Sequence, residues 1–332
     1  MQLKLYTGGF EMKIKTLLIT EDLLGAQREA LESMLPGTEI IYQKRAEREE
    51  IDRADVLFGH ADTSLTVNSP SLKWLHTPSA GSDHLAKLVE KGVLVTNSTG
   101  AYGPAISEHM LAMLLSALKR LPEYLMNQKA HKWQREGSVR SIEGSVLLSL
   151  GLGDIGSTFS RKMKALGAYT IGVRRSDASK PDYMDEVHLF DKIDELLPRA
   201  DIIALSLPNN AATRHIINAE RMALMKPETV LINIGRGTAV DTEALVDGLF
   251  RGYPSFACLD VTDPEPLPLE HPLWDMHNVI ITPHCSGGTT NPDTPLRTTA
   301  IFLENLAAYL EDRPLRNIVD AETGYRTSPA KS

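Results

Sequence analysis

Short apolar runs separated by polar, helix-compatible stretches make up the N-terminal part of the chain. The runs cover residues 15–20, 40–42, 54–58, 72–76 and 92–96. Runs of this length without polar alternation are typical of strands that are covered on both faces of a parallel sheet. Their alternation with helical segments predicts an α/β domain, in which helices cover the sheet.

The pattern changes at residues 104–121, which predict one long helix. Pro104 suits a first helical turn, where its missing N–H costs nothing. Leucine, methionine and isoleucine then occupy nearly every helical face. Because a helix that is apolar all round is buried on all sides, we expect this one at a domain junction or a subunit interface.

A second alternating series follows and predicts a second parallel sheet. Its expected strands cover residues 146–150, 169–173, 202–207, 230–234, 256–260 and 279–282. Helices are expected at residues 157–166, 193–197, 219–224 and 242–250, with a last helix at residues 298–310. Residues 1–13 show no clear period.

Composition narrows the class of protein. A chain of 332 residues is long enough for two domains. Its 35 Lys and Arg against 43 Asp and Glu give a net charge of −8 without a basic block, so we expect no nucleic-acid partner. Two cysteines, Cys258 and Cys285, are too few for a disulfide framework and indicate a reducing compartment. Since no membrane-spanning run and no signal peptide are evident, we expect a cytoplasmic protein without a membrane partner.

A glycine-rich turn carries the strongest chemical signal. Gly151, Gly153 and Gly156, with Asp154 and Ile155 between the last two, join an expected strand to an expected helix. In a dinucleotide-binding turn the first glycine allows the sharp bend, the second lets the backbone approach a pyrophosphate, and the third lets the helix pack on the strand. The helix N-terminus then offers N–H groups to the phosphates. A glycine-rich turn without a ligand is the alternative, which the flanking elements disfavour.

The end of the next expected strand indicates which dinucleotide binds. NAD-binding versions place Asp or Glu about 20 residues after the glycines, to hold the ribose 2′-hydroxyl. Here Arg174, Arg175 and Ser176 stand in that place. Because guanidinium groups form charge-assisted hydrogen bonds with a 2′-phosphate, we expect NADP(H) as the preferred cofactor, with NAD(H) as a second choice. Two arginines that merely end a strand at the surface are the alternative.

Three polar residues follow three further strands of the same predicted sheet. Arg236, Glu265 and His284 come after residues 230–234, 256–260 and 279–282. The carboxyl ends of parallel strands meet at one edge, so we expect these side chains to converge there. Beside a nicotinamide, an arginine binds a carboxylate and a histidine, with an ordinary pKa of about 6.5, transfers a proton. A glutamate hydrogen-bonded to that histidine favours its protonated form. Taken singly, each is more often a solvated loop side chain.

Two neighbours of these residues invite other interpretations. Cys285 is adjacent to His284, but adjacent residues of an extended segment point opposite ways. Hydride transfer also needs no covalent intermediate, so we expect no catalytic role for this thiol. His60 follows the strand at residues 54–58 and is a candidate for substrate contact. A surface histidine is the favoured alternative.

Together these motifs resemble the NAD(P)-dependent D-2-hydroxyacid dehydrogenase family, which includes the glyoxylate/hydroxypyruvate reductases. The resemblance runs from about residue 15 to about residue 319. Beyond the glycine turn and the three strand-end residues, the matching positions are residues 79–84, Asn97, Gly100, Glu108, residues 206–208, Asp260-Val261 and Pro283.

The resemblance implies a domain organisation. A doubly wound parallel-sheet (Rossmann) cofactor domain, residues 98–289, would be inserted in a smaller flavodoxin-like α/β substrate domain, residues 1–97 and 290–332. Backbone N–H groups of Ala80 and Gly81 would bind the substrate carboxylate together with Arg236, in a cleft between the domains. A homodimer would form through the cofactor domain.

The resemblance also implies further cofactor contacts. Asp260 would meet the nicotinamide carboxamide, and Leu207, Pro208, Thr213 and Ile234 would line the cofactor. We expect no metal site.

The sequence thus predicts an oxidoreductase that reduces a small 2-oxo acid by hydride transfer from NADPH, and the resemblance implies that the product is the D-2-hydroxy acid. His284 would act as general acid/base, Glu265 would support it, and Arg236 would bind the carboxylate. A non-catalytic dinucleotide-binding interaction or sensor protein of the same fold is the alternative. A formate dehydrogenase is disfavoured because those enzymes carry Gln where Glu265 stands, and a phosphoglycerate-type enzyme would favour NAD. The size of the substrate stays open, since one methylene changes selectivity by only about 1–3 kcal/mol.

Overall fold

The computed structural model describes residues 13–60, 62–175, 180–288 and 291–320, which fold into two compact units. The first unit joins the residues up to Thr99 with those from Pro295 onward, and the second comprises Gly100–Thr294. The second unit is therefore an insertion in the chain of the first.

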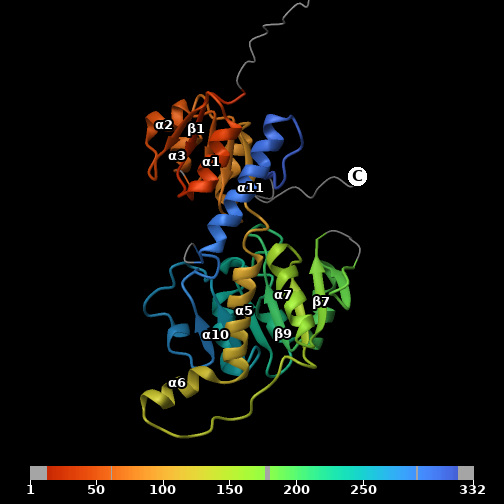
Figure 1. The fold of residues 1–332 in the computed structure, drawn as a ribbon. Coiled ribbons are helices and arrows are strands. Elements are labelled where there is room, and N and C mark those ends of the chain that lie inside the picture. Colours follow the sequence, from red (N-terminus) through yellow and green to blue (C-terminus); the bar gives the residue numbers. More distant parts are fainter. Residues whose placement is uncertain (1–12, 61, 176–179, 289–290, 321–332) are drawn as a thin grey trace, which may run out of the picture. The chain divides into compact units, whose positions relative to one another are not determined.

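The first unit contains a parallel sheet of five strands in the order β2-β1-β3-β4-β5. Figure 1 labels its strand β1 and the helices α1, α2, α3 and α11 of the same unit. The strands are β1 Thr16–Ile19, β2 Glu39–Tyr42, β3 Val56–Phe58, β4 Trp74–Thr77 and β5 Leu94–Asn97. The helices are α1 Gly25–Met34, α2 Arg48–Arg53, α3 Thr63–Thr66, α4 Ala86–Glu90, the short η1 Asp83–Leu85 and the C-terminal α11 Asp293–Leu310. The strand order is that of the flavodoxin-like fold.

The C-terminal helix completes the core of the first unit. Phe302 of α11 stacks on Phe58 of β3 with ring centroids 4.2 Å apart, and it lies 5.6 Å from Trp74 of β4. All three side chains are fully buried. Burial of aromatic rings dominates core energetics, so the two ends of the chain stabilise the same sheet.

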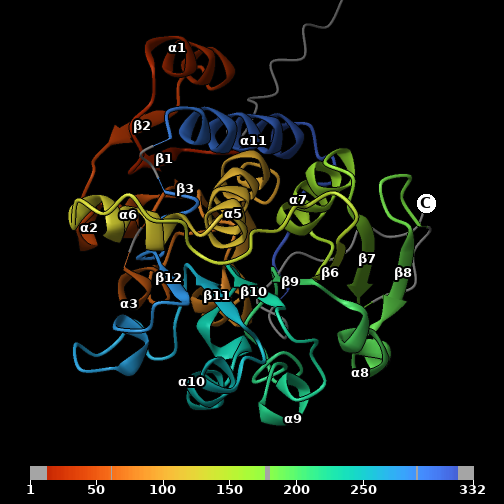
Figure 2. The same ribbon diagram turned by 90° about the horizontal axis from the view of Figure 1, so that it is seen from below.

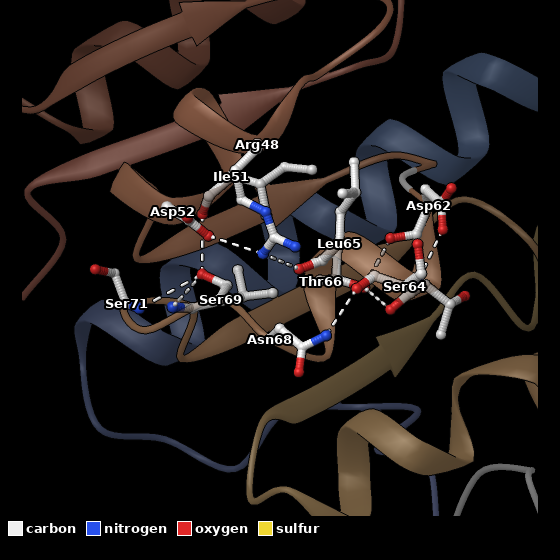
Figure 3. Close-up of polar contacts among 12 residues, drawn as sticks. Arg48, Ile51, Asp52, Asp62, Ser64, Leu65, Thr66, Asn68, Ser69 and Ser71 are labelled. Carbon is white, nitrogen blue, oxygen red and sulfur yellow. Dashed lines mark hydrogen bonds and ion pairs between the residues drawn. The ribbon is translucent and has the colours of Figure 1, made fainter.

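Hydrogen bonds fix the connection between α2 and β4 (Figure 3). Asp62 caps the N-terminus of α3. Arg48 of α2 donates to the Leu65 carbonyl at 3.3 Å, and the Ser69 hydroxyl donates to the Ile51 carbonyl at 3.0 Å. These side chains thereby tie α2 to α3 and to the turn that precedes β4.

The second unit contains a parallel sheet of seven strands in the order β12-β11-β10-β9-β6-β7-β8. The strands are β6 Val146–Leu150, β7 Tyr169–Arg174, β8 Glu186–Leu189, β9 Ile202–Leu205, β10 Val230–Asn233, β11 Phe256–Leu259 and β12 Val279–Ile281. Chain order runs outward from β6 to β8 on one side and from β9 to β12 on the other. Ligands of doubly wound sheets bind at this reversal, outside the carboxyl ends of the strands.

Helices cover both faces of the second sheet (Figure 2). One face is covered by α5 Gly103–Leu118 and α7 Asp154–Ala165, and the other by α8 Ile193–Leu196, α9 Ala219–Met222 and α10 Thr242–Arg251. The remaining helices are α6 Leu121–Lys129 and the short η2 Phe190–Lys192, η3 Leu197–Arg199, η4 Gly237–Ala239 and η5 Pro272–Trp274. The predicted fold class, two parallel α/β sheets with one domain inserted in the other, is confirmed.

The single long helix predicted at residues 104–121 is wrong in its extent. It ends at Leu118, Arg120 has a left-handed φ of 56°, and α6 begins at Leu121. Pro122 explains the break, because a proline cannot donate the i to i−4 hydrogen bond that would continue α5. Leu115 is also 39% exposed, so the helix is not covered on all sides within this chain. Strand β8 was not predicted.

None of the helices in the described ranges combines the length and the apolar character needed to cross a bilayer.

Candidate active site

The turn after β6 has the shape predicted for a dinucleotide-binding loop. Gly151 has a φ of +98°, and a Cβ there would lie 2.8 Å from the Ser206 carbonyl oxygen. A Cβ on Gly156 would lie 2.0 Å from the Gly151 carbonyl oxygen, so α7 approaches β6 only because residue 156 has no side chain. Gly153 is different. It is exposed, and within the described part of the chain no neighbouring atom lies within 4 Å of its Cβ position. A phosphate can therefore approach the backbone there.

The side chains of the next two residues face the protein. Asp154 Oδ2 accepts hydrogen bonds from the N–H groups of Gly100 at 3.2 Å and Gly103 at 2.8 Å, which fixes the start of α5 beside α7. Ile155 packs, half-buried, against the core beneath these helices. Because intrahelical bonds do not reach the first-turn N–H groups, a cofactor contact from Asp154 and Ile155 would come from their backbones.

Two arginines lie beside the glycine turn. The Gly151 N–H donates to the Val173 carbonyl at 2.9 Å, which places the end of β7 next to the turn. Arg174 is half-buried and Arg175 exposed. In the ranges that the structure describes, neither guanidinium forms an ion pair or a side-chain hydrogen bond. The third predicted residue, Ser176, lies outside the described residues.

The loops after β9 and β10 pack on each other. Leu207 and Ile234 are 3% and 5% exposed, and a Cβ on Gly235 would lie 2.7 Å from Leu207 backbone atoms. The Thr213 hydroxyl donates to the Pro208 carbonyl at 2.5 Å and stabilises the turn after β9. A cofactor contact by any of these residues stays a prediction.

Arg236 stands on a loop that a buried asparagine holds. Asn233 Oδ1 accepts from the Gly235 N–H at 3.2 Å, and its Nδ2 donates to the Arg236 carbonyl at 3.0 Å. A Cβ on Gly237 would lie 1.8 Å from the Thr262 carbonyl oxygen. The Arg236 loop therefore lies directly against the segment that follows β11.

That segment carries Glu265, which pairs with His284. His284 Nδ1 and Glu265 Oε1 are 2.7 Å apart, with the two side chains 48% and 42% exposed. Since a carboxylate only accepts, we assign the proton of this bond to Nδ1. The other ring nitrogen, Nε2, is then the atom that can exchange a proton with a substrate.

Asp260 anchors the backbone on which His284 stands. Its carboxylate accepts the Thr282 hydroxyl at 2.6 Å and the N–H groups of Cys285 at 3.0 Å and Ser286 at 3.1 Å. Its backbone carbonyl accepts the His284 N–H at 2.8 Å. Asp260 is 1% exposed. The contact that was predicted with the nicotinamide carboxamide stays a prediction, whereas this anchoring role was not predicted.

Sequence reasoning also missed His109. This residue of α5 places Nε2 at 3.0 Å from Thr282 Oγ1 and at 3.9 Å from Asp260 Oδ1. The contact joins residues 173 positions apart, so no local spacing indicates it. The one available signal was an ionisable pair, Glu108 and His109, in a helix whose other residues are uncharged.

Ala80 and Gly81 lie on the loop after β4 in the first unit, whereas Arg236, Glu265 and His284 belong to the second. Asn97 Nδ2 donates to the Ala80 carbonyl at 3.0 Å and supports that loop. A shared role of this loop with Arg236 in binding a carboxylate stays a prediction.

The two residues that invited other interpretations add little to the site. The Cys285 thiol is exposed and free. His60 belongs to the first unit, and its carbonyl accepts the Thr20 hydroxyl.

The second unit thus presents a glycine turn, two arginines and the His284–Glu265 pair at the carboxyl edge of one sheet. The turn after β6 fits a pyrophosphate, the arginines after β7 fit an anionic group beside it, and the His284–Glu265 pair fits proton transfer. Within the described ranges, no three His, Cys, Asp or Glu side chains gather as metal ligands would. The arrangement matches dinucleotide-dependent redox chemistry on a substrate with a protonatable oxygen.

Comparison with known families gives an independent result. The family model described as "D-isomer specific 2-hydroxyacid dehydrogenase, NAD binding domain" matches residues 111–286. Glyoxylate/hydroxypyruvate reductase B of Pectobacterium atrosepticum is 31% identical over 274 residues, which cover 80% of this chain and 84% of that protein.

Solved structures agree in fold. A D-isomer specific 2-hydroxyacid dehydrogenase family protein from Aeromonas salmonicida has a TM-score of 0.81 at 31% identity, covering 92% of this chain and 99% of that one. The NADPH-dependent glyoxylate/hydroxypyruvate reductase of Sinorhizobium meliloti, in complex with NADP and sulfate, has a TM-score of 0.79 at 26% identity, covering 94% and 100%.

Proposed function

Because the chain belongs to the D-isomer specific 2-hydroxyacid dehydrogenase family, we propose that it reduces a small 2-oxo acid to the D-2-hydroxy acid with NADPH. The observation that carries this proposal is the His284–Glu265 pair at 2.7 Å, on the same sheet edge as the glycine turn. A bound reduced nicotinamide supplies the hydride for the carbonyl carbon.

The chain's own residues move the proton that this reduction requires. Glu265 holds Nδ1 of His284, so the ring presents Nε2–H to the substrate oxygen and delivers the proton as the alkoxide forms. Partial exposure of both side chains lets the histidine regain its proton from solvent. A positioned acid of this kind contributes about 10²–10⁴-fold in rate.

Arg236 is proposed to bind the substrate carboxylate. Its planar guanidinium can form two parallel hydrogen bonds to a carboxylate and thereby orient the adjacent carbonyl. The rigid packing of Gly237 on Thr262 supports this role, because it fixes the backbone that carries the arginine. Ala80 and Gly81 are proposed to add backbone N–H donors.

We propose NADP(H) over NAD(H). Arg174 and Arg175 carry positive charge beside the glycine turn, where a carboxylate would otherwise hold the ribose hydroxyls. A charged hydrogen bond contributes about 1.5–3 kcal/mol, which corresponds to roughly 10- to 100-fold in affinity. The Sinorhizobium meliloti relative, whose description names NADPH, is consistent with this choice.

A homodimer through the second unit is also proposed. Leu115 of α5 and Leu121, Leu125 and Met126 of α6 are 39%, 45%, 58% and 64% exposed. These exposed apolar side chains belong to two consecutive helices, and exposed apolar patches mark interfaces.

Oxidation of NADPH and NADH with glyoxylate, hydroxypyruvate and bulkier 2-oxo acids tests the proposed function. We expect fast turnover of NADPH with one or two acids and slow turnover of NADH. His284→Ala should lower kcat about 10²–10⁴-fold, whereas His277→Ala, at an exposed histidine of the same unit, should not. Tight NADPH binding without turnover on any acid would instead favour a non-catalytic binding protein.

A further inference from the structure

The segment that carries His284 is held by one residue of the neighbouring strand. Asp260 accepts the N–H groups of three consecutive residues: that of His284 with its backbone carbonyl, and those of Cys285 and Ser286 with its two carboxylate oxygens. His284 itself has a left-handed φ of 50°. Non-glycine residues adopt this conformation rarely, and they keep it where the surroundings hold them.

The Asp260 carboxylate is in turn contacted by the side chains of Thr282 and His109. The Thr282 hydroxyl lies 2.6 Å from Asp260 Oδ1 and 3.0 Å from His109 Nε2. A hydroxyl has a single proton. Because the Asp260 carboxylate only accepts, the Thr282 hydroxyl donates this proton in the short hydrogen bond to Asp260 Oδ1. Thr282 Oγ1 must then accept from His109, so His109 carries a proton on Nε2. The chain of donors runs from His109 through Thr282 to Asp260.

On these contacts we infer that His109 is a positioning residue for His284, acting through Thr282 and Asp260. This inference rests on the proposed function, in which His284 is the acid. Asp260 Oδ1 receives both the Thr282 hydroxyl and the Cys285 N–H. The orientation of this oxygen therefore couples the hydrogen bond from α5 to the backbone that aims the imidazole.

The positions of Asp260 and Thr282 explain how helix α5, through His109, contributes to the orientation of the Asp260 carboxylate. Asp260 and Thr282 lie at the ends of neighbouring strands, β11 and β12. Without an outside donor, the Thr282 hydroxyl could rotate away from the carboxylate. The Nε2–H of His109 occupies one of the two lone pairs of Thr282 Oγ1, in an arrangement that keeps the hydroxyl proton directed toward Asp260. Chains of hydrogen bonds strengthen one another in this way.

Kinetics of variants test the inference. His109→Phe keeps the ring size and removes the donor, and a misplacement of about 1 Å in the acid can cost about 10²-fold. We expect His109→Phe to lower kcat about 10- to 100-fold, with the Kd for NADPH within about two-fold of wild type. His109→Gln, whose amide can donate from nearly the same place, should stay within about three-fold of wild type. Ser116→Ala, on the same helix and bonded only to the Ala112 carbonyl among described residues, is the matched control.

A second pair of variants does not depend on His109. Thr282→Val should reproduce the loss in kcat, and Thr282→Ser should restore it. The double variant His109→Phe/Thr282→Val should be no slower than the slower single variant, because both act through one chain of contacts. A wild-type kcat in His109→Phe, an equal loss in His109→Gln, or additive losses in the double variant would each overturn the inference.

A spectroscopic measurement separates this inference from the proposed function. In the NMR spectrum of ¹⁵N-labelled protein, the His109 signals are assigned by comparison with His109→Gln. We expect Nε2 of His109 to carry a proton that is protected from exchange with solvent, and we expect this protection to be lost in Thr282→Val. A bare Nε2 would refute the inferred chain whatever the enzyme activity. If the wild type reduces no 2-oxo acid, the proposed function fails, and this spectrum still decides the donor assignment.

Discussion

A histidine buried in the first unit makes the stability of that unit sensitive to pH. His76 of β4 is fully buried among aromatic rings, with Nδ1 at 2.7 Å from Thr96 Oγ1 and Nε2 at 3.1 Å from Ser98 Oγ. Burial, and to a lesser degree the Arg316 guanidinium, lowers the pKa of His76 from 6.5 to about 3. The folded unit therefore keeps this imidazole neutral where the unfolded chain would protonate it.

The sign and size of the effect follow from linkage. At a pH above 6.5 both states are neutral at His76 and the pKa difference has no effect. As the pH falls from 6.5 toward about 3, only the unfolded chain gains this proton, so stability is lost. Each pKa unit corresponds to about 1.4 kcal/mol. The loss is about 2 kcal/mol between about pH 7.5 and about pH 5, and about 5 kcal/mol once the pH is below both pKa values.

The assay should report on the first unit alone. Of the three tryptophans, Trp133 and Trp274 are exposed and Trp74 is fully buried near the His76 ring. In a Trp133→Phe/Trp274→Phe background, Trp74 fluorescence during urea unfolding gives the free energy of unfolding at each pH. The matched variant is His76→Gln, which cannot titrate but keeps a hydrogen-bonding group.

We expect the parent to lose about 2 kcal/mol more than His76→Gln between about pH 7.5 and about pH 5. The comparison removes the contributions of other groups, because they are common to both proteins. If the free energy of unfolding depended on pH equally in the two proteins, the reasoning would be refuted, because His76 would then have the same pKa in the folded and the unfolded chain.

Two further predictions concern the candidate active site. Gly153→Val should leave the melting temperature unchanged and weaken NADPH binding more than ten-fold, whereas Gly156→Val should destabilise the fold by about 1–3 kcal/mol or more. Fluorescence titration with NADPH measures the binding and thermal melts measure the stability. Equal melting temperatures of the two variants would contradict the different roles assigned to the two glycines. Glu265→Ala should lower kcat about 10-fold or more without changing the Kd for NADPH, because His284 loses the hydrogen-bond partner of its Nδ1. Single-turnover kinetics measure this loss, with Glu270→Ala, at an exposed carboxylate, as the control. An unchanged rate in Glu265→Ala would show that Glu265 does not support His284.

Local pattern determined much of the fold. Buried parallel strands are continuous apolar runs, and every predicted strand is present in the structure within a few residues of its expected bounds. Strand β8 was missed because Glu186 and His188 interrupt its apolar character and both are engaged in polar contacts at the sheet edge. The break between α5 and α6 was missed although Pro122 marks it, because the apolar pattern runs through residue 121.

The sequence also indicated much of the candidate site. The glycine turn, the arginines after β7 and the residues Arg236, Glu265 and His284 all follow strands, and the carboxyl ends of parallel strands share one edge. That rule needs only chain order and strand direction, both of which sequence supplies. It led to the Glu265–His284 contact, which the structure contains.

Only the tertiary structure decided how that site is supported. His109 and Thr282 are 173 positions apart and meet because α5 packs against β10 and β11, and β12 is the next strand of the sheet. Nothing in the sequence marks Asn233 or Asp260 as a residue that holds a loop, because this role depends on which backbone groups the loops bring to each side chain. Periodicity and strand order determine where a site lies, because they are properties of single elements. The hydrogen bonds that aim its side chains are properties of the packing between elements, which no local pattern records.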